Sequence, residues 1–318
     1  MLARMTPLSL TPTFSLLLHR HRRLVHRSLI DLPFSYSSPH CFSPKPTSVL
    51  HFHFLYRPPH ATTTRSSSPS FTPVAAAGGA LLQDAGATAA VLAGAYCLVL
   101  AFETLTEREV IKQNLSRKLV HISSGLLFAI SWPIFSTSKE ARYFASLVPL
   151  VNCLRLVIYG LSLAPDDGLI KSVTREGNPE ELLRGPLYYV LILIFCSLVF
   201  WRESPVGVIT LAMMCAGDGV ADIMGRRFGS VKLPYNQQKS WVGSISMFIF
   251  GFLISIGMLY YYSALGYFQL DWMSAIQRVA FVALLSTVVE SLPTTETVDD
   301  NISVPLTSMV AAYLSFGF

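Results

Sequence analysis

The chain has 318 residues, of which 52% are apolar and 14% are charged, and its mean hydropathy is +0.47. Soluble domains usually carry about 25% charged residues, so this composition excludes an ordinary soluble globular protein and predicts an integral membrane protein. The formal net charge of +5 does not indicate nucleic-acid binding, because the excess of basic side chains lies near the N-terminus.

Residues 1 to 78 differ from the rest of the chain. They hold eight of the 24 Lys and Arg side chains, one of the 19 acids and seven of the eight histidines, so the remainder has 16 bases and 18 acids. A Ser-rich, Arg-bearing, acid-poor start is typical of an organellar transit peptide, and its Ser and Pro content favours a plastid. We predict a disordered chloroplast transit peptide over 1–78, processed near residues 70–78, and a membrane domain over 79–318. A disordered cytosolic tail is the alternative.

The remainder is a series of apolar runs. A membrane-spanning helix needs about 20 mostly apolar residues, and backbone groups in hydrocarbon must be paired within the span, which favours helices. The sequence therefore predicts an all-α, polytopic integral membrane helical bundle with about seven or eight transmembrane helices. The expected spans are 85–102, 119–135, 144–162, 186–201, 206–221, 242–262, 278–292 and 303–318.

Eight spans place alternate loops on one face of the membrane. The loops on that face are 103–118, 163–185, 222–241 and 293–302, and together they hold eleven Lys and Arg residues. After the leader, the loops and helix ends on the opposite face hold only Lys139, Arg142, Arg202 and Arg278. This asymmetry follows the positive-inside tendency, so we expect the basic face toward the stroma. The main polar motifs also lie on this face.

The first motif is SRKLVHISSG, residues 116–125. Arg117 and Lys118 lie three or four residues before His121, so the three side chains can share one face of a helix. They are candidates for binding phosphate, with His121 as a proton shuttle or hydrogen-bond donor. A basic helix end that reaches the lipid headgroups is the alternative for the two cations. His121 is stronger as a candidate, because ionisable groups inside a membrane are costly.

The second motif is SVTREGNPEELLRGPLYY, residues 172–189. Gly177, Asn178 and Pro179 break the chain, and two glutamates then begin a helix, where acids suit the helix dipole. Much of this motif is explained as ordinary loop and cap chemistry. Arg175 and Glu176 are the functional candidates within it.

The third motif is CAGDGVADIMGRRFGSVKLPYNQQKSWVGS, residues 215–244, and it is the most informative. Asp218 and Asp222 are spaced i, i+4, so they lie on one helix face and repel each other unless a cation or a proton lies between them. Glycines that allow close approach of a ligand and cations suited to phosphate follow. These are Gly217, Gly219, Gly225, Gly229, Arg226, Arg227, Lys232 and Lys239. Carboxylates, glycines and cations together are typical of phosphoryl transfer with Mg²⁺. Glycines that only pack helices are the alternative.

The fourth motif is VVESLPTTETVDDNISVP, residues 288–305. Glu290 lies near the end of a span, and Asp299, Asp300 and Asn301 precede the last span. Asp-Asp-Asn offers oxygen ligands for a hard cation, and it is equally a good turn and N-cap sequence.

These motifs together resemble the polyprenol kinase family, and within it the plant phytol kinases. The resemblance rests on GDGVADIMGRRFGSVKLPYN…KSWVGSISMF, with SRKLVHISSG and REGNPEELLRGPLYY upstream and ESLP…DDNISVP downstream, and it runs from about residue 82 to the C-terminus. It implies a multi-pass chloroplast membrane enzyme that transfers phosphate from CTP to phytol for tocopherol synthesis. Farnesol and geranylgeraniol are alternative substrates within the same family. The family motif matches Asp218, Asp222, Lys239, Asp299 and Asp300.

The chemistry explains why such a motif ends a membrane span. Phytol belongs in lipid and a nucleotide in water, so the two meet only at the membrane edge. We assign Asp222 with Asp299 or Asp300 to Mg²⁺, and Asp218 to orienting or deprotonating the hydroxyl. The expected catalytic residues are Asp218, Asp222, Lys239 and His121. The expected nucleotide-binding residues are Gly217, Gly219, Gly225, Gly229, Arg226, Arg227, Lys239, Arg117, Lys118 and Arg175.

Three other classes of protein are less consistent with the sequence. CDP-alcohol phosphotransferases carry D-G-x-x-A-R, from which the sequence starting DGVAD departs at the arginine, and they carry a second paired-Asp motif that is missing here. A membrane prenyltransferase needs two D-x-x-x-D motifs, and one is present. A transporter is the non-enzyme alternative, but no inverted repeat is visible and the polar residues crowd one face. The expected partners are the lipid bilayer, an isoprenoid alcohol and a nucleoside triphosphate, without nucleic acid.

Overall fold

The structure is a computed structural model of the chain, and it describes residues 73–164, 174, 178–293 and 299–317. Every element below belongs to the unit Ser67–Phe318. The predicted transit peptide lies outside the described residues up to residue 72, so it stays a prediction. The first helix begins at Pro73, within the segment where we expect processing.

The prediction of an all-α membrane bundle is confirmed, and each of the eight predicted spans coincides with a helical segment. The long helices are α1 (Pro73–Glu107), α2 (Gln113–Ser131), α3 (Ala141–Gly160), α5 (Gly185–Val199), α8 (Trp241–Ala264), α9 (Trp272–Ser291) and α10 (Asp300–Phe316). The remaining span consists of α6 (Pro205–Ala212), the π-helix η3 (Met213–Asp218) and α7 (Gly219–Phe228) in direct succession. Two short helices, η1 (Trp132–Ile134) and η2 (Pro179–Leu183), precede α3 and α5.

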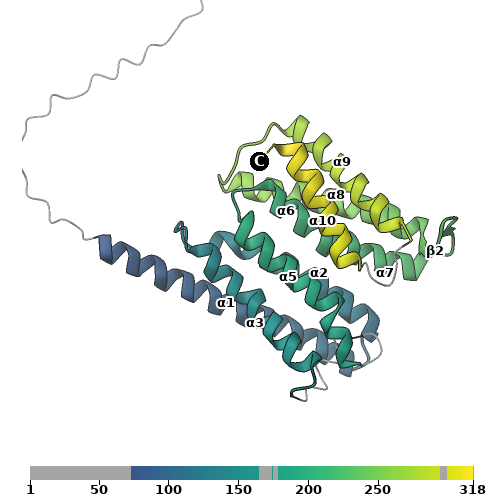
Figure 1. Cartoon of the computed structure of the whole chain (residues 1–318), viewed down its shortest axis with the longest axis horizontal. Coiled ribbons are helices and arrows are strands. Elements are labelled where there is room, and N and C mark those ends of the chain that lie inside the picture. The colour runs from purple at the N-terminus through teal and green to yellow at the C-terminus, as the bar shows by residue number, and fades with distance from the viewer. Residues whose placement is uncertain (1–72, 165–173, 175–177, 294–298, 318) are drawn as a thin grey trace, which may run out of the picture. The chain divides into compact units, whose positions relative to one another are not determined.

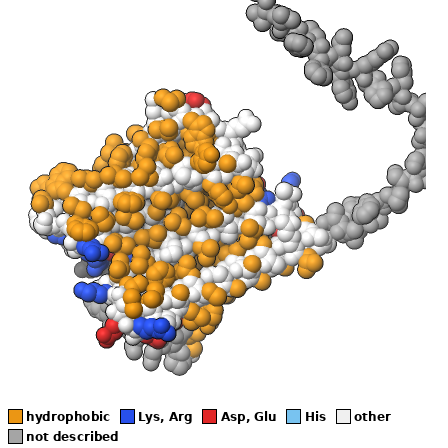
Figure 2. Space-filling model, turned by 180° about the vertical axis from the view of Figure 1, so that it is seen from behind, with side chains coloured by type: hydrophobic (Ala, Val, Ile, Leu, Met, Phe, Trp, Pro, Cys, Tyr) orange, Lys and Arg blue, Asp and Glu red, His pale blue; other side chains and the backbone are white. Residues whose placement is uncertain are grey.

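Six helical segments among the described residues are long and apolar enough to cross a membrane. They are 78–107, 141–160, 179–199, 205–228, 241–264 and 272–291. The other two helices differ for visible reasons, because α2 carries Arg117, Lys118 and His121 and α10 is only 17 residues long. Figure 2 agrees with a membrane protein, since hydrophobic side chains cover most of the face it shows.

Side chains at the helix starts explain where several helices begin. Ser204 caps α6 by accepting a hydrogen bond from the backbone N–H of Val206, and Ser240 caps α8 in the same way. Asp299 caps α10, and its carboxylate accepts from the N–H of Asn301 at 2.8 Å. An N-cap of this kind typically contributes about 1 kcal/mol. The Asp-Asp-Asn sequence therefore forms an N-cap, which is one of the two roles predicted for it from the sequence.

The helices pack in two groups within this unit (Figure 1). Helices α1, α2, α3 and α5 contact one another, and α6, η3, α7, α8, α9 and α10 form the other group. Contacts of α2 with η3 and α7, and of α5 with α10, join the groups. The segment 205–228 is the most enclosed of the six, with 83% of its apolar window buried against 17% for 78–107. The richest polar motif thus lies on the central helix.

One short sheet interrupts the helices. Strands β1 (Lys232–Leu233) and β2 (Asn236–Ser240) pair antiparallel, with Lys232 opposite Ser240 and Leu233 opposite Asn236. Asn236 ties this hairpin to the end of α9, because its Nδ2 donates to the carbonyl oxygens of Ser291 and Leu292 at 3.1 and 3.0 Å. The hairpin therefore holds Lys239 over the C-terminal end of α9.

Candidate active site

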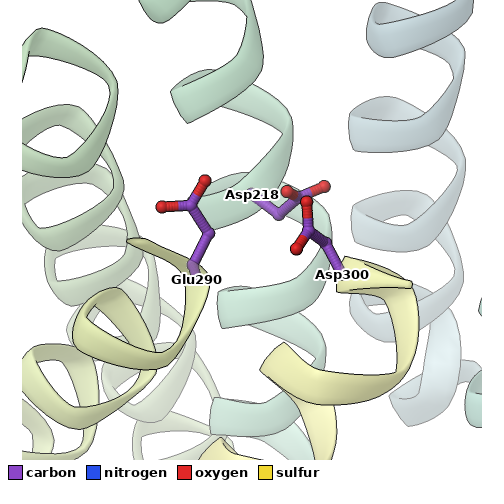
Figure 3. Close-up of side chains that lie close together, drawn as sticks. All are labelled: Asp218, Glu290 and Asp300. Atoms are coloured by element: carbon purple, nitrogen blue, oxygen red, sulfur yellow. The ribbon is translucent and has the colours of Figure 1, made fainter. Parts of the chain in front are cut away.

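Three carboxylates converge where α9, α10 and the π-helix meet (Figure 3). One oxygen each from Asp218, Glu290 and Asp300 lies within 4.8 Å of the other two. Asp218 and Glu290 are each only 4% exposed, so their charges are largely out of water. Three close carboxylates repel one another unless positive charge lies between them.

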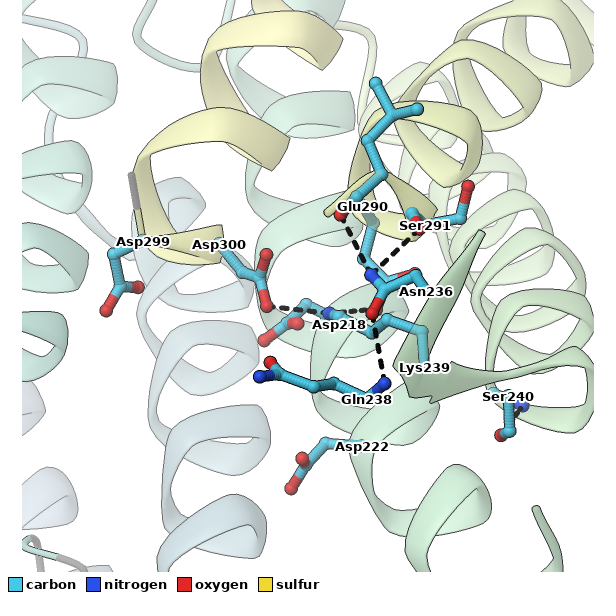
Figure 4. A network of polar contacts seen from close by, with 12 residues as sticks. Asp218, Asp222, Asn236, Gln238, Lys239, Ser240, Glu290, Ser291, Asp299 and Asp300 are labelled. Atoms are coloured by element: carbon cyan, nitrogen blue, oxygen red, sulfur yellow. Dashed lines mark hydrogen bonds and ion pairs between the residues drawn. The ribbon is translucent and has the colours of Figure 1, made fainter. Parts of the chain in front are cut away.

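Lysine side chains supply that positive charge in the structure. Lys239 ion-pairs with Glu290, and its Nζ lies 2.8 Å from Asp300 Oδ2 (Figure 4). Lys118 of α2 approaches the third carboxylate, with Nζ 3.2 Å from Asp218 Oδ2. Burial on its own would lower the pKa of Lys239, but the carboxylates of Glu290 and Asp300 raise it above its usual value. Burial raises the pKa of Asp300 although Lys239 opposes that shift.

The carboxylate cluster suits a divalent cation. Glu290 Oε2 and Asp300 Oδ1 are buried and have no hydrogen-bond partner among the described residues. Unpaired carboxylate oxygens are the ligands that Mg²⁺ prefers, and buried polar atoms without partners are otherwise costly. The donor set of Asp218, Glu290 and Asp300 therefore fits Mg²⁺, whereas the sequence analysis assigned the ion to Asp222 with Asp299 or Asp300.

Asp222 and Asp299, the other two predicted aspartates, have different surroundings. Asp222 lies one turn beyond Asp218 and pairs with Arg226, whose Nε is 2.9 Å from Asp222 Oδ1. Its Oδ2 is 3.9 Å from Lys118 Nζ. Asp299 accepts hydrogen bonds from the backbone and side-chain nitrogens of Asn301. Both residues line the same cavity as the cluster.

His121 is part of the packing around the π-helix. Its Nε2 lies 3.2 Å from the carbonyl oxygen of Met214, which accepts the bond, and its ring contacts Tyr189 with 4.2 Å between centroids. The Tyr189 hydroxyl donates to the His121 carbonyl oxygen at 2.8 Å. His121 lines the cavity and its hydrogen bond is to the helix that carries Asp218, so its predicted catalytic role stays a prediction.

The predicted glycines mostly lie at helix crossings. A Cβ on Gly217 would lie 3.5 Å from Gly251 of α8, and one on Gly225 would lie 3.5 Å from Gly243 of the same helix. A Cβ on Gly219 would collide with Ile122 of α2, and one on Gly229 would collide with Ser240. Of these four predicted glycines only Gly225 lines the cavity. Close packing of α7 on α8 and α2 therefore accounts for most of them.

The predicted cations divide into three sets. Arg117, Lys118, Arg226 and Lys239 line the cavity, as does Lys232. Arg227 is not among the lining residues, and its guanidinium lies 5.4 Å from the ring centre of Phe228. Arg175 lies outside the described residues, so its predicted role stays a prediction.

Sequence reasoning did not place two features of this site. Glu290 was not among the predicted site residues, although an acid at the end of an apolar span is a signal of function. It also missed Asn236, whose Oδ1 accepts from the N–H of Gln238 at 3.0 Å while its Nδ2 holds α9. Nothing in a polar loop sequence distinguishes such an anchor from an exposed asparagine.

The site belongs to a cavity of about 1040 Å³ that receives residues from all four loops of the basic face. Lys118, Arg184, Asp222 and Asp300 come from the four loops and their adjoining helix ends, and they line one space. Away from these residues the cavity continues between α1, α2, α3 and α5, where its walls are mostly apolar. The cavity thus has two connected parts. We call the part lined by Lys118, Arg184, Asp222 and Asp300 the charged chamber, and the part between α1, α2, α3 and α5 the apolar limb.

Fold and site together define a multi-pass helical membrane protein with a charged cavity that opens into an apolar one. No protein-family model and no solved structure match the chain. The phytol kinase 1, chloroplastic, of Arabidopsis thaliana is 68% identical over 244 residues, which are 77% of this chain and 80% of the relative. The probable phytol kinase 1, chloroplastic, of Glycine max is 64% identical over 273 residues, or 85% and 90% of the two chains.

A more distant relative is the farnesol kinase, chloroplastic, of Arabidopsis thaliana, which is 46% identical over 210 residues, or 66% of this chain and 68% of the relative. The chain belongs to the phytol kinase family. These relatives are named chloroplastic, and with its apolar helices the chain is a multi-pass chloroplast membrane protein.

Proposed function

We propose that this chain phosphorylates the hydroxyl of phytol, with CTP as the donor, and yields phytyl phosphate and CDP for tocopherol synthesis. The observation that supports this most directly is the single cavity, because it places a carboxylate and lysine cluster at the mouth of an apolar limb. The high identity to proteins named phytol kinase supports the choice of alcohol.

The transfer needs a proton acceptor, ligands for Mg²⁺ and cations that bind phosphate, and the cavity offers candidates for all three. The alcohol oxygen bonds to the γ-phosphorus, the bond from that phosphorus to the β,γ-bridging oxygen breaks, and the hydroxyl proton passes to a carboxylate. We assign this carboxylate to Asp222, which opens to the cavity one turn beyond the cluster. A base of this kind typically contributes about 10²–10⁴-fold in rate.

The negative charge on the phosphates must also be neutralised, and we assign this role to a metal ion and to the nearby cations. We assign Mg²⁺ to Asp218, Glu290 and Asp300, where it would neutralise charge on the phosphates during transfer. Lys118, Lys239 and Arg226 are the cations nearest the carboxylates, and we assign them to phosphate oxygens. This exchanges the roles that the sequence gave to Asp218 and Asp222, because Asp218 lies in the carboxylate cluster and Asp222 pairs with Arg226.

Farnesol and geranylgeraniol remain the alternative substrates, and the farnesol kinase relative supports considering them. Membranes containing the chain should transfer labelled γ-phosphate from CTP to phytol, and ATP or UTP should serve less well. Membranes with Asp300→Asn are the matched control for background kinases. Absence of any labelled lipid phosphate with every alcohol and nucleotide would contradict the proposal.

A further inference from the structure

The apolar limb of the cavity has a definite direction, which follows from contacts along its four helices. In α2, Lys118 lies beside Asp218 at the charged end, and Phe128 is ten residues further along. At 1.5 Å per residue this is about 15 Å along the helix axis from Lys118. Both residues line the cavity, so the limb reaches at least to the level of Phe128.

Helix α1 runs antiparallel to α2 along this limb. Ser116 Oγ of α2 donates to the carbonyl of Phe102 at 3.4 Å, and a Cβ on Gly94 would lie 3.8 Å from Leu127. Moving down α2 from Ser116 to Leu127 therefore corresponds to moving back along α1 from Phe102 to Gly94. Val91, which lines the cavity one turn before Gly94, lies at the depth of Phe128.

The other two helices reach the same depth. Gly185 at the start of α5 lies against Asp299 and Asn301, so the lining residue Leu193 is about 12 Å further in. Helix α3 enters from the opposite end, because Thr88 of α1 donates to the carbonyl of Phe144 at 3.0 Å. Val148, one turn after Phe144, therefore lines the deep part of the limb.

These four residues close the deep end with apolar atoms. Val91, Phe128, Val148 and Leu193 are all buried. The polar lining residues of α3, Asn152 and Arg155, follow Val148 and so lie nearer the charged chamber. A tail that starts at the charged chamber and lies along the limb would end against these four side chains.

We propose that Val91, Phe128, Val148 and Leu193 set the length of isoprenoid chain that the enzyme accepts, by contacting the last isoprene unit of the alcohol. This inference rests on the proposed function. Each CH₂ that is buried changes binding roughly fourfold, so loss or gain of one isoprene unit at the deep end strongly changes selectivity.

The test compares geranylgeraniol with farnesol, which is one isoprene unit shorter, in membranes that contain each variant. Val148→Trp fills the deep end, so kcat/KM for geranylgeraniol should fall at least about tenfold relative to farnesol. Leu147→Trp is the matched control, because Leu147 is the preceding residue and is 41% exposed on the outside of α3. It should leave the ratio within about twofold, and neither variant should change KM for CTP.

A second variant guards against misfolding of the first. Phe128→Ala enlarges the deep end and should raise the preference for geranylgeraniol over farnesol, the opposite direction. Equal changes for both alcohols in these two variants, or a change confined to KM for CTP, would overturn the assignment of the limb to the alcohol tail. A wild-type protein that phosphorylates neither alcohol nor phytol would instead contradict the proposed function itself.

Discussion

At the scale of single residues, the informative contrast is between Glu290 and Asp222. Glu290 shares the carboxylate cluster with Asp218 and Asp300, whereas Asp222 lies outside it and pairs with Arg226. Two acids of similar chemistry therefore have separable roles, and their variants should fail in different ways.

We expect Glu290→Gln to need much more Mg²⁺ for its residual turnover, because the amide keeps the size of the side chain but removes the charge. Asp222→Asn should lose about 10²–10⁴-fold in kcat with little change in Mg²⁺ dependence. Steady-state rates across a Mg²⁺ series measure both. Glu203→Gln is the control, since Glu203 is exposed and does not line the cavity. Identical Mg²⁺ profiles for all three variants would refute the division of roles.

Lys239 neutralises the carboxylate cluster, so the loss of stability caused by replacing Lys239 should depend on pH. Its raised pKa keeps the amine charged below and through the usual lysine range, so the stability it provides is lost only as the pH rises above that range. In Lys239→Met the carboxylates of Glu290 and Asp300 lose the cation that pairs with both of them, so their repulsion is stronger at pH 8. Burial raises the pKa of Asp300, so protonation relieves part of this repulsion as the pH falls toward 5.

The expected result is a larger loss of thermal stability at pH 8 than at pH 5 for Lys239→Met, measured on detergent-purified protein. Lys239→Arg keeps the charge and should show a smaller pH-dependent difference. A Lys239→Met protein that is equally stable relative to wild type at both pH values would show that Lys239 does not offset the carboxylates.

At the scale of elements, much was readable from the sequence. The eight helical segments could be predicted because each contains an apolar run, and Asp218 and Asp222 could be placed one turn apart because i, i+4 residues meet on one helix face. The π-helix and the β-hairpin could not be predicted, since a π-helix has no residue signature and the strands are only two and five residues long. Lys239 and Glu290 are 51 residues apart, and no local pattern predicts such a pair.

The ends of the helices opposite the site depend on a single buried arginine. Arg202 donates to the carbonyl oxygens of Trp132, Phe135 and Ser136 at 3.1, 2.9 and 2.5 Å. Its guanidinium also lies 4.9 Å from the ring centre of Tyr267. It therefore helps to satisfy the carbonyls at the end of α2 and η1, of which that of Trp132 also accepts from the backbone N–H of Phe135.

Arg202→Met keeps most of the side-chain volume but removes all three hydrogen bonds. Each buried carbonyl left unpaired costs about 1–3 kcal/mol, so we expect a large drop in the thermal stability of purified protein. The folded fraction should keep normal KM values, because Arg202 does not line the cavity. Arg142→Met is the control, since Arg142 makes one longer bond, at 3.3 Å, to Leu198. Equal stability of the two variants would contradict the capping role.

At the scale of the whole molecule, the N-terminal boundary of the functional unit can be tested. Asp84 of α1 accepts hydrogen bonds from the backbone and side chain of Ser136 at 2.6 and 2.7 Å, so α1 is anchored to the η1 region. A chain that starts at Pro73 keeps this anchor, and one that starts at residue 90 loses it. We expect the first to insert and phosphorylate alcohols in a heterologous membrane, and the second to be inactive. An active chain from residue 90 would show that α1 is dispensable up to that point.

The π-helix has one further consequence, for the rotational phase of the central helix. A π turn holds one residue more than an α turn, and η3, which ends at Asp218, stands between the buried apolar residues of α6 and Asp222 of α7. Deleting Met213 would convert η3 into ordinary helix and turn everything beyond it by about 100°. If Ile209 keeps its place in the core, Asp222 leaves the cavity. If Asp222 stays in the cavity, Ile209 leaves its place in the core. We expect an inserted but inactive protein, whereas Met213→Leu should stay active, as alcohol phosphorylation by the two variants would reveal.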